Sequence, residues 1–253
     1  MSDTRLAVEL SDGVLTITLD RPEKRNAMDT TMVSELLAQL ERADLDKDVR
    51  VVALRGAGKD FCAGADLAEL LESVDQTVDE NTASAGQLGN VFIAMRKLPK
   101  IVAAVVHGRA LAGGCGLATA CDLVLAHEHA SFGYPEIKRG FVPAMVMAML
   151  GRAVGEKVAF DLVGTGRVLT AAEALNVGLI SRVLPADGFD READSILREL
   201  VCASGSALAL IKRQLYELEG RGFEEAIALG AQVNAVARST PDFRAAVERF
   251  LEK

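Results

Sequence analysis

The sequence predicts an α/β fold assembled from repeated strand–strand–helix units, followed by a helical C-terminal region. Residues 6–10 and 14–19 alternate apolar and polar side chains on either side of Asp12-Gly13, which is typical of a β-hairpin. The apolar runs 51–55 and 101–106 are typical of buried strands, and each leads into a glycine-containing loop and then a helix. This order favours a spiral of similar units over a doubly wound sheet.

Two further segments differ in how strongly their pattern indicates a structure. Residues 32–43 carry apolar side chains at a spacing of three and four, with Asp29 or Thr30 available as the N-cap, so we expect an amphipathic helix. The stretch DQTVDENTASAG at residues 75–86 is polar and aperiodic. We expect it to form a surface loop.

After about residue 187, apolar residues recur at helical spacing to the end of the chain. We therefore divide the chain into a core at residues 1–195, which would hold the functional site, and a C-terminal helical region at residues 196–253. A helical region of this length beside an α/β core is expected to cover an interface between subunits.

Composition narrows the classes of function. Half of the 253 residues are hydrophobic, which is ample for a large core, and the formal net charge of −8 argues against a nucleic-acid or anionic-membrane surface. The N-terminal segment does not have the pattern of a signal peptide, and no apolar run reaches the length of a membrane span. The cysteines lack CxxC spacing, so we expect a reducing compartment, the cytoplasm, and no bound metal; they are Cys62, Cys115, Cys121 and Cys202.

Two glycine-rich turns share one physical design. FCAGADL at residues 61–67 and LAGGC at residues 111–115 each follow an expected strand and open an expected helix. Small residues at such a turn let a ligand approach the backbone, and the first N–H groups of a helix have no partner inside the helix. If the two turns faced each other, they would present two convergent donors, which is the design of an oxyanion hole.

These turns belong to a longer series of motifs. The series continues with DRPEKRNAMD (20–29), ALAGGCGLATACD (110–122), FGYPEIKRG (132–140) and TGRVLTAAEALNVGLISRVLP (165–185). In order and spacing it resembles the enoyl-CoA hydratase/isomerase family, whose members have the crotonase fold. The resemblance covers nearly the whole chain. It implies a spiral of ββα units, C-terminal helices that pack against neighbouring subunits, a homotrimer or a hexamer built as a dimer of trimers, and an acyl-CoA substrate that brings its own coenzyme A, with no separate cofactor.

The resemblance also implies site residues. A thioester oxygen would lie between the backbone N–H groups of Ala65 and Gly113. The Lys24 and Arg25 side chains make chemical sense as partners for phosphates, although a solvated turn explains them equally well. The full set expected to contact substrate is Lys24, Arg25, Ala27, Ala63, Asp66, Leu67, Ala68, Gly114 and Gly116.

The family's hydratases have two glutamates, and this chain has one of them. Glu136 matches the glutamate that follows the proline of the FGYPE stretch, whereas Gly116 stands in the first turn of the helix, where the other would be. Gly116 lies at i+3 from Gly113 and so shares its helix face. A glutamate there would reach the substrate, and glycine supplies no such group.

A single carboxylate favours the movement of a double bond over the addition of water, because the proton transfers of hydration are normally divided between two carboxylates. We therefore expect Glu136 to shuttle a proton during conversion of 3-enoyl-CoA to 2-enoyl-CoA, with its pKa raised by an apolar pocket that includes Phe132, Tyr134, Phe141 and Met145. A hydratase with a single or relocated carboxylate is the close alternative. A non-catalytic acyl-CoA or RNA binding protein is the alternative from another class, although the negative net charge speaks against RNA.

The remaining polar residues are expected to have structural roles. Asp122 is expected to bond backbone, and His107 to pack or bond backbone near the second turn. His127 and His129 have no third ligand at suitable spacing for a metal. Glu69 and Glu72 are expected on an outer helix face.

Overall fold

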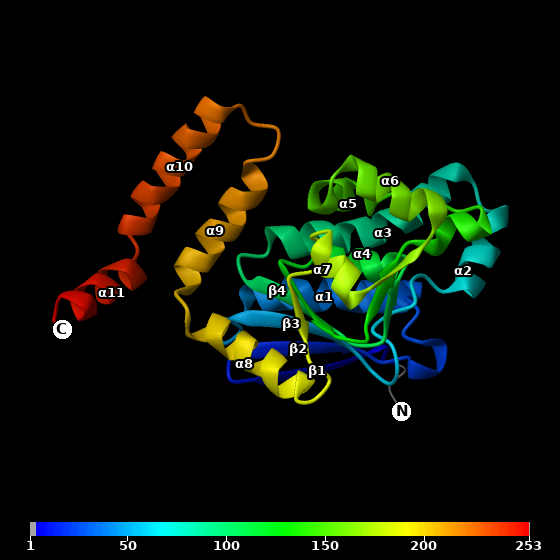
Figure 1. Ribbon diagram of the computed structural model, residues 1–253, viewed down its shortest axis with the longest axis horizontal. Coiled ribbons are helices and arrows are strands. Elements are labelled where there is room, and N and C mark those ends of the chain that lie inside the picture. Colours follow the sequence, from blue (N-terminus) through cyan, green and yellow to red (C-terminus); the bar gives the residue numbers. More distant parts are fainter. Residues whose placement is uncertain (1–3, 253) are drawn as a thin grey trace.

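The computed structural model describes residues 4–252 and shows a mixed α/β fold with two sheets (Figure 1). The first three residues of the segment tested for a signal peptide, and the last residue of the C-terminal region, lie outside the described part. The larger sheet has the strand order β1-β2-β3-β4-β6-β9, and the smaller one has the order β5-β7-β8. Every neighbouring pair in the larger sheet is parallel except the β1–β2 hairpin.

The expected hairpin and strands are confirmed. The larger sheet comprises β1 Leu6–Ser11, β2 Val14–Leu19, β3 Val51–Gly56, β4 Ile101–Val106, β6 Leu123–His127 and β9 Arg182–Leu184, and the smaller comprises β5 Arg109–Leu111, β7 Ser131–Gly133 and β8 Val168–Thr170. The hairpin turns at Asp12 and Gly13, whose φ angles are both positive, at 48° and 79°. Such a turn matches the twist of the strands it joins.

Helices cover both faces of the larger sheet because side chains in β3 and β4 alternate between two apolar clusters. Val52 and Leu54 face the cluster that includes α1 (Thr30–Leu45), α3 (Val78–Lys97), α4 (Gly113–Ala120) and α5 (Met147–Val154). Val51 and Ala53 face α8 (Phe189–Cys202). The shorter elements are α2 Leu67–Glu72, α6 Glu156–Thr165, α7 Ala171–Asn176 and the 3-10 turns η1 Pro22–Lys24, η2 Ser73–Asp75 and η3 Pro135–Arg139.

The prediction of a surface loop at residues 75–86 is wrong, because most of that stretch forms the first half of α3. Thr77 caps the helix, and its side chain and backbone are bonded reciprocally with Glu80 in a capping box. The second half of α3 buries Val91, Phe92 and Met95 in the core. The polar half is therefore a solvent-facing extension of a helix that is anchored further along the chain.

The expected helical C-terminal region is confirmed. It continues beyond α8 with α9 Gly205–Glu217, α10 Phe223–Arg238 and α11 Pro241–Leu251. Figure 1 shows α9 leaving the core and α10 and α11 running beside it, away from the sheet. The division between residues 195 and 196 stays a prediction, and α8 runs through it. Within residues 4–252, no helix combines the length and the apolar character needed to cross a bilayer.

A buried ion pair fastens α9 to the core. Lys212 is 4% exposed, and its ammonium lies 2.7 Å from Asp122 Oδ2 and donates to the carbonyl oxygens of Met95 and Lys100. Asp122 also accepts from the Val102 backbone N–H and the Tyr216 hydroxyl. The structural role expected for Asp122 is thus confirmed: it joins β4, α4 and α9.

We expect Lys212→Met to lower the free energy of unfolding by about 3–5 kcal/mol, because it leaves the Asp122 carboxylate buried without its counter-ion. Urea titration followed by circular dichroism measures this. Arg213→Met is the matched control, since the exposed Arg213–Glu217 pair is 3.7 Å apart and pairs of that kind contribute roughly 0–1 kcal/mol. Equal losses in the two variants would contradict the anchoring role of Lys212.

Candidate active site

Three chain segments emerge side by side at one edge of the smaller sheet. β5 and β7 are parallel, with Leu111 opposite Gly133, and Cys62 forms a parallel bridge to Ala110. The carboxyl ends of parallel strands meet at the same edge, so the residues that follow each segment are brought together. These residues are Ala63–Asp66, Ala112–Gly113 and Tyr134–Glu136, which include all three of the expected catalytic positions.

Two backbone N–H groups converge at this edge. A methyl group placed on Gly113 would lie 3.8 Å from the Ala65 nitrogen, so the two residues are close neighbours. Within residues 4–252, neither the Ala65 N–H nor the Gly113 N–H has a hydrogen-bond acceptor. Gly113 begins α4, where the helix dipole adds positive character to its N–H. Two neighbouring donors of this kind are the arrangement that the expected oxyanion hole requires.

The residue before the second donor, Ala112, has a strained backbone conformation. Ala112 has φ 52° and ψ −129°, a conformation that L residues rarely adopt and that costs about 1–3 kcal/mol. Its own N–H is bonded to the Gly133 carbonyl at 2.8 Å, which fixes the peptide before the turn. Gly114 must be glycine because a Cβ there would lie 2.7 Å from Cys62 Cβ and closer still to the Cys62 carbonyl oxygen. The first two segments therefore touch through their backbones.

Glu136 is placed at this edge by the turn η3. Pro135 begins the turn, and the Glu136 carbonyl oxygen accepts from the N–H groups of Gly140 and Phe141, which hold the turn closed. The Glu136 side chain is buried, and in the described part of the chain its Oε2 atom has no hydrogen-bond partner. Burial raises the pKa of Glu136 above its usual value, while its own backbone N–H and the Arg139 charge lower it by less. A buried carboxylate with a free oxygen is suited to exchange protons near neutral pH.

The polar groups near Glu136 are hydrogen-bonded to one another. Tyr134 is fully buried, its hydroxyl lies 2.7 Å from the Thr119 hydroxyl, and Thr119 donates to the Cys115 carbonyl oxygen. Burial raises the pKa of the Cys115 thiol to about 12, and the nearby Glu136 charge adds to the rise. Cys115 is therefore a buried apolar residue, as expected, and its position beside Glu136 places the carboxylate next to the first turn of α4.

The space beside Gly116 is filled. A Cβ on Gly116 would overlap the Val146 Cγ2 methyl and would lie 3.6 Å from Phe92 Cζ. Val146 comes from the segment just before α5, 30 residues further along the chain, and it is buried. A glutamate at position 116 has no room in this structure. The missing carboxylate is thus accompanied by an apolar side chain that covers its place, a contact that the sequence analysis missed.

The side chains expected to form an apolar pocket around Glu136 differ in burial. Phe132 and Tyr134 are buried, whereas Phe141 is 52% exposed and donates its backbone N–H to the Glu136 carbonyl oxygen. Met145 packs over α3, with its sulfur 3.4 Å from the position of a Cβ on Gly89.

The residues expected to contact substrate lie around the first donor. Lys24 and Arg25 are exposed, Ala27 and Ala63 are half-buried, and Leu67 and Ala68 are exposed at the start of α2. The Ala63 N–H donates to the Arg25 carbonyl oxygen, and the Asp66 carboxylate caps α2 through the Ala68 N–H. Asp66 is also paired with the buried Arg21, a residue that sequence reasoning missed. The DRP triplet that contains Arg21 was the available signal.

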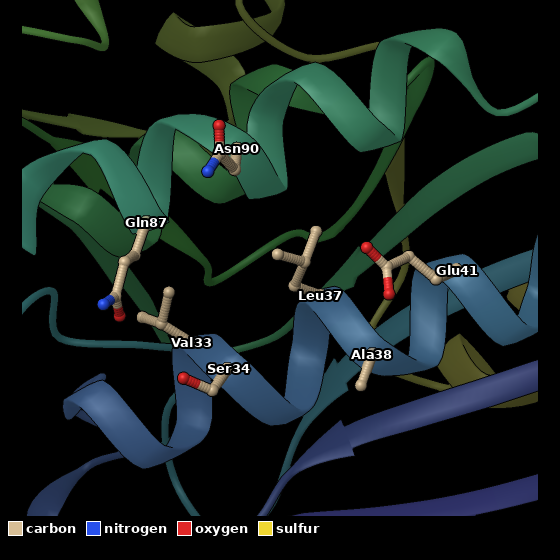
Figure 2. A pocket seen from close by; sticks show the side chains of 7 residues that line it. All are labelled: Val33, Ser34, Leu37, Ala38, Glu41, Gln87 and Asn90. Atoms are coloured by element: carbon tan, nitrogen blue, oxygen red, sulfur yellow. The ribbon is translucent and has the colours of Figure 1, made fainter. Parts of the chain in front are cut away.

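Two cavities lie elsewhere. A groove of about 170 Å³ lies between α1 and α3, and Val33 and Leu37 point into it from α1 toward α3 (Figure 2). A second cavity, of about 480 Å³, is lined by Pro22, Glu23, Arg25, Gly58, Lys59, Asp60 and Arg109. Neither cavity is lined by Ala65, Gly113 or Glu136. The candidate active site is therefore identified by its chemical groups and not by a cavity.

The other polar residues have structural contacts. His107 Nε2 lies 3.0 Å from the Gly58 carbonyl oxygen, and Glu69 accepts from the Thr30 N–H and hydroxyl. His127 lies beside His129 and Phe189. Among residues 4–252, no group of three or more histidine, cysteine, aspartate or glutamate side chains could hold a metal ion.

One known protein family matches this sequence over almost the whole chain. The family described as "Enoyl-CoA hydratase/isomerase" matches residues 9–253. The chain belongs to the enoyl-CoA hydratase/isomerase family. The resemblance inferred from the motifs is thereby confirmed.

Individual members of the enoyl-CoA hydratase/isomerase family agree in sequence and structure. The Thermus thermophilus protein named "Putative enoyl-CoA hydratase" is 41% identical over 247 residues, covering 97% of this chain and 98% of that protein. An enoyl-CoA hydratase structure from Mycobacterium smegmatis superposes with a TM-score of 0.93 at 32% identity, covering 98% of this chain and 96% of that one. The human enoyl Coenzyme A hydratase domain-containing protein 3 (ECHDC3) gives 0.93 at 29% identity, with 98% and 97% covered. The crotonase fold is confirmed.

We expect Glu136→Gln to stabilise the protein at neutral pH. The raised pKa of Glu136 means that its ionisation opposes folding. The wild type should therefore match the variant below about pH 4, lose relative stability as the pH rises through the folded-state pKa, and lie about 1–3 kcal/mol lower above it. Urea titrations at pH values from 4 to 8 measure the difference.

Glu173→Gln is the control for this experiment. Hydrogen bonds from the Thr170 N–H and hydroxyl lower the pKa of Glu173, so the loss of its charge should destabilise the protein at neutral pH. A change of the same sign in the two variants would contradict the assignment of Glu136 as a buried, poorly solvated carboxylate.

Proposed function

We propose that this protein is an acyl-CoA enzyme that moves a double bond, converting 3-enoyl-CoA to 2-enoyl-CoA. The observation that carries the proposal is the pairing of one buried carboxylate, Glu136, with two free N–H donors, together with the filled space beside Gly116. Membership of the enoyl-CoA hydratase/isomerase family supplies the substrate class. The number of acid–base groups then favours the isomerase reaction over hydration.

The proposed reaction uses one proton carrier. The Glu136 carboxylate removes a proton from C2 of the 3-enoyl thioester, and the electrons of that C–H bond move toward the thioester oxygen to form a dienolate. The N–H groups of Ala65 and Gly113 stabilise this oxygen, each contributing roughly 3 kcal/mol in the transition state. Glu136, now protonated, returns its proton to C4, and the double bond lies between C2 and C3. No water is consumed.

The rest of the substrate would lie along the first donor turn. The exposed side chains of Lys24 and Arg25 would meet phosphate groups of coenzyme A, and the backbone from Ala63 to Ala68 would run beside it. In this proposal coenzyme A enters only as part of the substrate and no separate cofactor takes part. We propose that the protein acts in the cytoplasm.

Hydration of 2-enoyl-CoA is the second candidate, because the relatives' printed names are those of hydratases. A hydratase on this scaffold would use Glu136 alone or a carboxylate brought in from elsewhere. Non-catalytic binding of acyl-CoA is the remaining possibility. The three differ in what happens to a bound enoyl thioester, and they are separated by direct assay.

We expect the protein to convert 3-enoyl-CoA to 2-enoyl-CoA much faster than it hydrates 2-enoyl-CoA, as followed by absorbance and mass spectrometry. Glu136→Gln should lower kcat of the isomerisation by about 10²- to 10⁴-fold. Glu173→Gln, on an exposed helix N-terminus, should leave it unchanged. Faster hydration than isomerisation would favour the hydratase, and binding without turnover would favour the non-catalytic alternative.

We expect Gly116→Glu alone to gain little hydratase activity, because its Cβ overlaps the Val146 methyl and overpacking costs about 1–3 kcal/mol of stability. In the double variant Gly116→Glu/Val146→Ala the methyl is gone, and hydration of 2-enoyl-CoA should rise at least about tenfold over the single variant. Val146→Ala alone is the control and should gain none. Equal hydration by the single and double variants would show that Val146 does not obstruct position 116.

We also propose a homotrimer, or a hexamer built from two trimers, assembled through the C-terminal helices. Helices α10 and α11 stand away from the core (Figure 1). Together with α9 they expose large apolar side chains, which is typical of a surface that meets another chain. These side chains are Ile211, Leu215, Phe223, Ile227, Val236, Phe243, Val247, Phe250 and Leu251.

A further inference from the structure

We infer that Arg21 is a positioning residue for the oxyanion donor at Ala65, a role that rests on the proposed function of that N–H. Arg21 is buried, with 9% of its surface exposed. Its guanidinium lies between the starts of two helices. Through them it holds the turn in which Ala65 lies.

One guanidinium joins the two N-cap carboxylates. Arg21 Nη2 lies 3.0 Å from Asp66 Oδ2, and Nη1 lies 3.2 Å from Asp29 Oδ2. Asp66 Oδ1 caps α2 by accepting from the Ala68 N–H, and Asp29 Oδ1 caps α1 by accepting from the Met32 N–H. The planar fork of arginine can bind two carboxylates at once, which a lysine ammonium does less well.

The same guanidinium touches both sides of the backbone bridge that frames Ala65. The Met28 N–H donates to the Gly64 carbonyl oxygen, and the Asp66 N–H donates to the Met28 carbonyl oxygen, so Ala65 lies between the two bonds with its own N–H free. Arg21 Nη1 donates to the Ala27 carbonyl oxygen at 2.6 Å, one residue before Met28. Arg21 thus holds the residue before Met28 and the residue after Ala65.

Side-chain packing contributes little to the position of the helix that follows this turn. Helix α2 has no fully buried residue, and its side chains Leu67 and Leu71 are 57% and 73% exposed. A further contact is polar: Glu69 accepts from the Thr30 N–H and hydroxyl. A segment with little apolar packing depends on its polar contacts for its position, and a donor must be held within about 0.5 Å to serve a transition state.

The charges around Arg21 are paired with charges of opposite sign. Arg5 Nε lies 2.9 Å from Asp29 Oδ2, the carboxylate oxygen that Arg21 also contacts. We therefore assign the effect of Arg21 on the thioester oxygen to the placement of the Ala65 N–H. Removal of Arg21 should affect the reacting carbonyl more than the binding of the coenzyme A moiety.

The test compares Arg21→Met with the wild type. We expect kcat for 3-enoyl-CoA to fall at least about tenfold with KM changed less than about threefold. We also expect the infrared carbonyl stretch of bound ¹³C-labelled butanoyl-CoA, an unreactive probe, to shift from its lowered wild-type frequency toward that of the free thioester. Arg21→Lys should recover part of both effects.

Arg55→Met is the matched control. Arg55 also bonds two aspartates, Asp190 and Asp194, each at 2.7 Å, but it does so between β3 and α8. It should leave kcat and the carbonyl frequency unchanged. If Arg21→Met fails to fold, Asp66→Asn replaces it, because it keeps a capping oxygen and removes only the charge that faces Arg21.

The outcomes separate this inference from the proposed function. A wild type that binds butanoyl-CoA and lowers its carbonyl frequency, with no change in Arg21→Met or Asp66→Asn, would overturn the role of Arg21 alone. A wild type that leaves the carbonyl frequency unshifted would overturn the oxyanion hole, and the inference with it. A loss of kcat and a return of the carbonyl frequency in Arg21→Met, with neither in Arg55→Met, would establish the role.

Discussion

The site depends on two backbone N–H groups that find no acceptor within residues 4–252. They belong to Ala65 and Gly113, which are both half-buried. Here parallel segments use their neighbouring N–H groups to bind one another, and the strained Ala112 turns the next one outward. The rest of the structure supports this arrangement: the sheets bring the segments together, and helix packing around the sheet keeps them there.

A buried carboxyl belongs to the same edge of the smaller sheet. Glu136 is a buried carboxyl with an unpartnered oxygen, in a region whose neighbours are apolar or already bonded to one another. Donors without acceptors and an acceptor without donors are placed at the same sheet edge. In the proposed function, the thioester oxygen would accept from the two N–H groups and an acidic C–H bond would face the Glu136 carboxylate.

Much of the fold could be predicted from the sequence because its signals are local. The hairpin, the buried strands and the Asp29 cap depend on residues that are close along the chain. Helix α3 was misjudged because its apolar anchors, Val91, Phe92 and Met95, lie beyond the polar stretch, and because the capping box at Thr77 and Glu80 was overlooked. Ala65, Gly113 and Glu136 were selected by the order of their motifs, and the structure brings them to one edge.

Long-range contacts at the site could not be read in this way. The overlap between Gly116 and Val146 depends on how the segment before α5 crosses α4, and nothing in either stretch alone indicates it. The pairing of Arg21 with Asp66 spans 45 residues and requires two helices to begin side by side. Such contacts follow from tertiary packing, which single-sequence patterns do not encode.

The scarcity of apolar packing under α2, which has no fully buried residue, has a consequence for divergence within the family. A change in Leu67, Leu71 or another exposed position of this helix opens no cavity in the core, so the turn that carries Ala65 can be altered while the sheet stays intact. Substitutions there can adjust the fit of one donor to a new thioester in small steps. The structure thus separates the part that must stay constant from the part on which selection for new substrates can act.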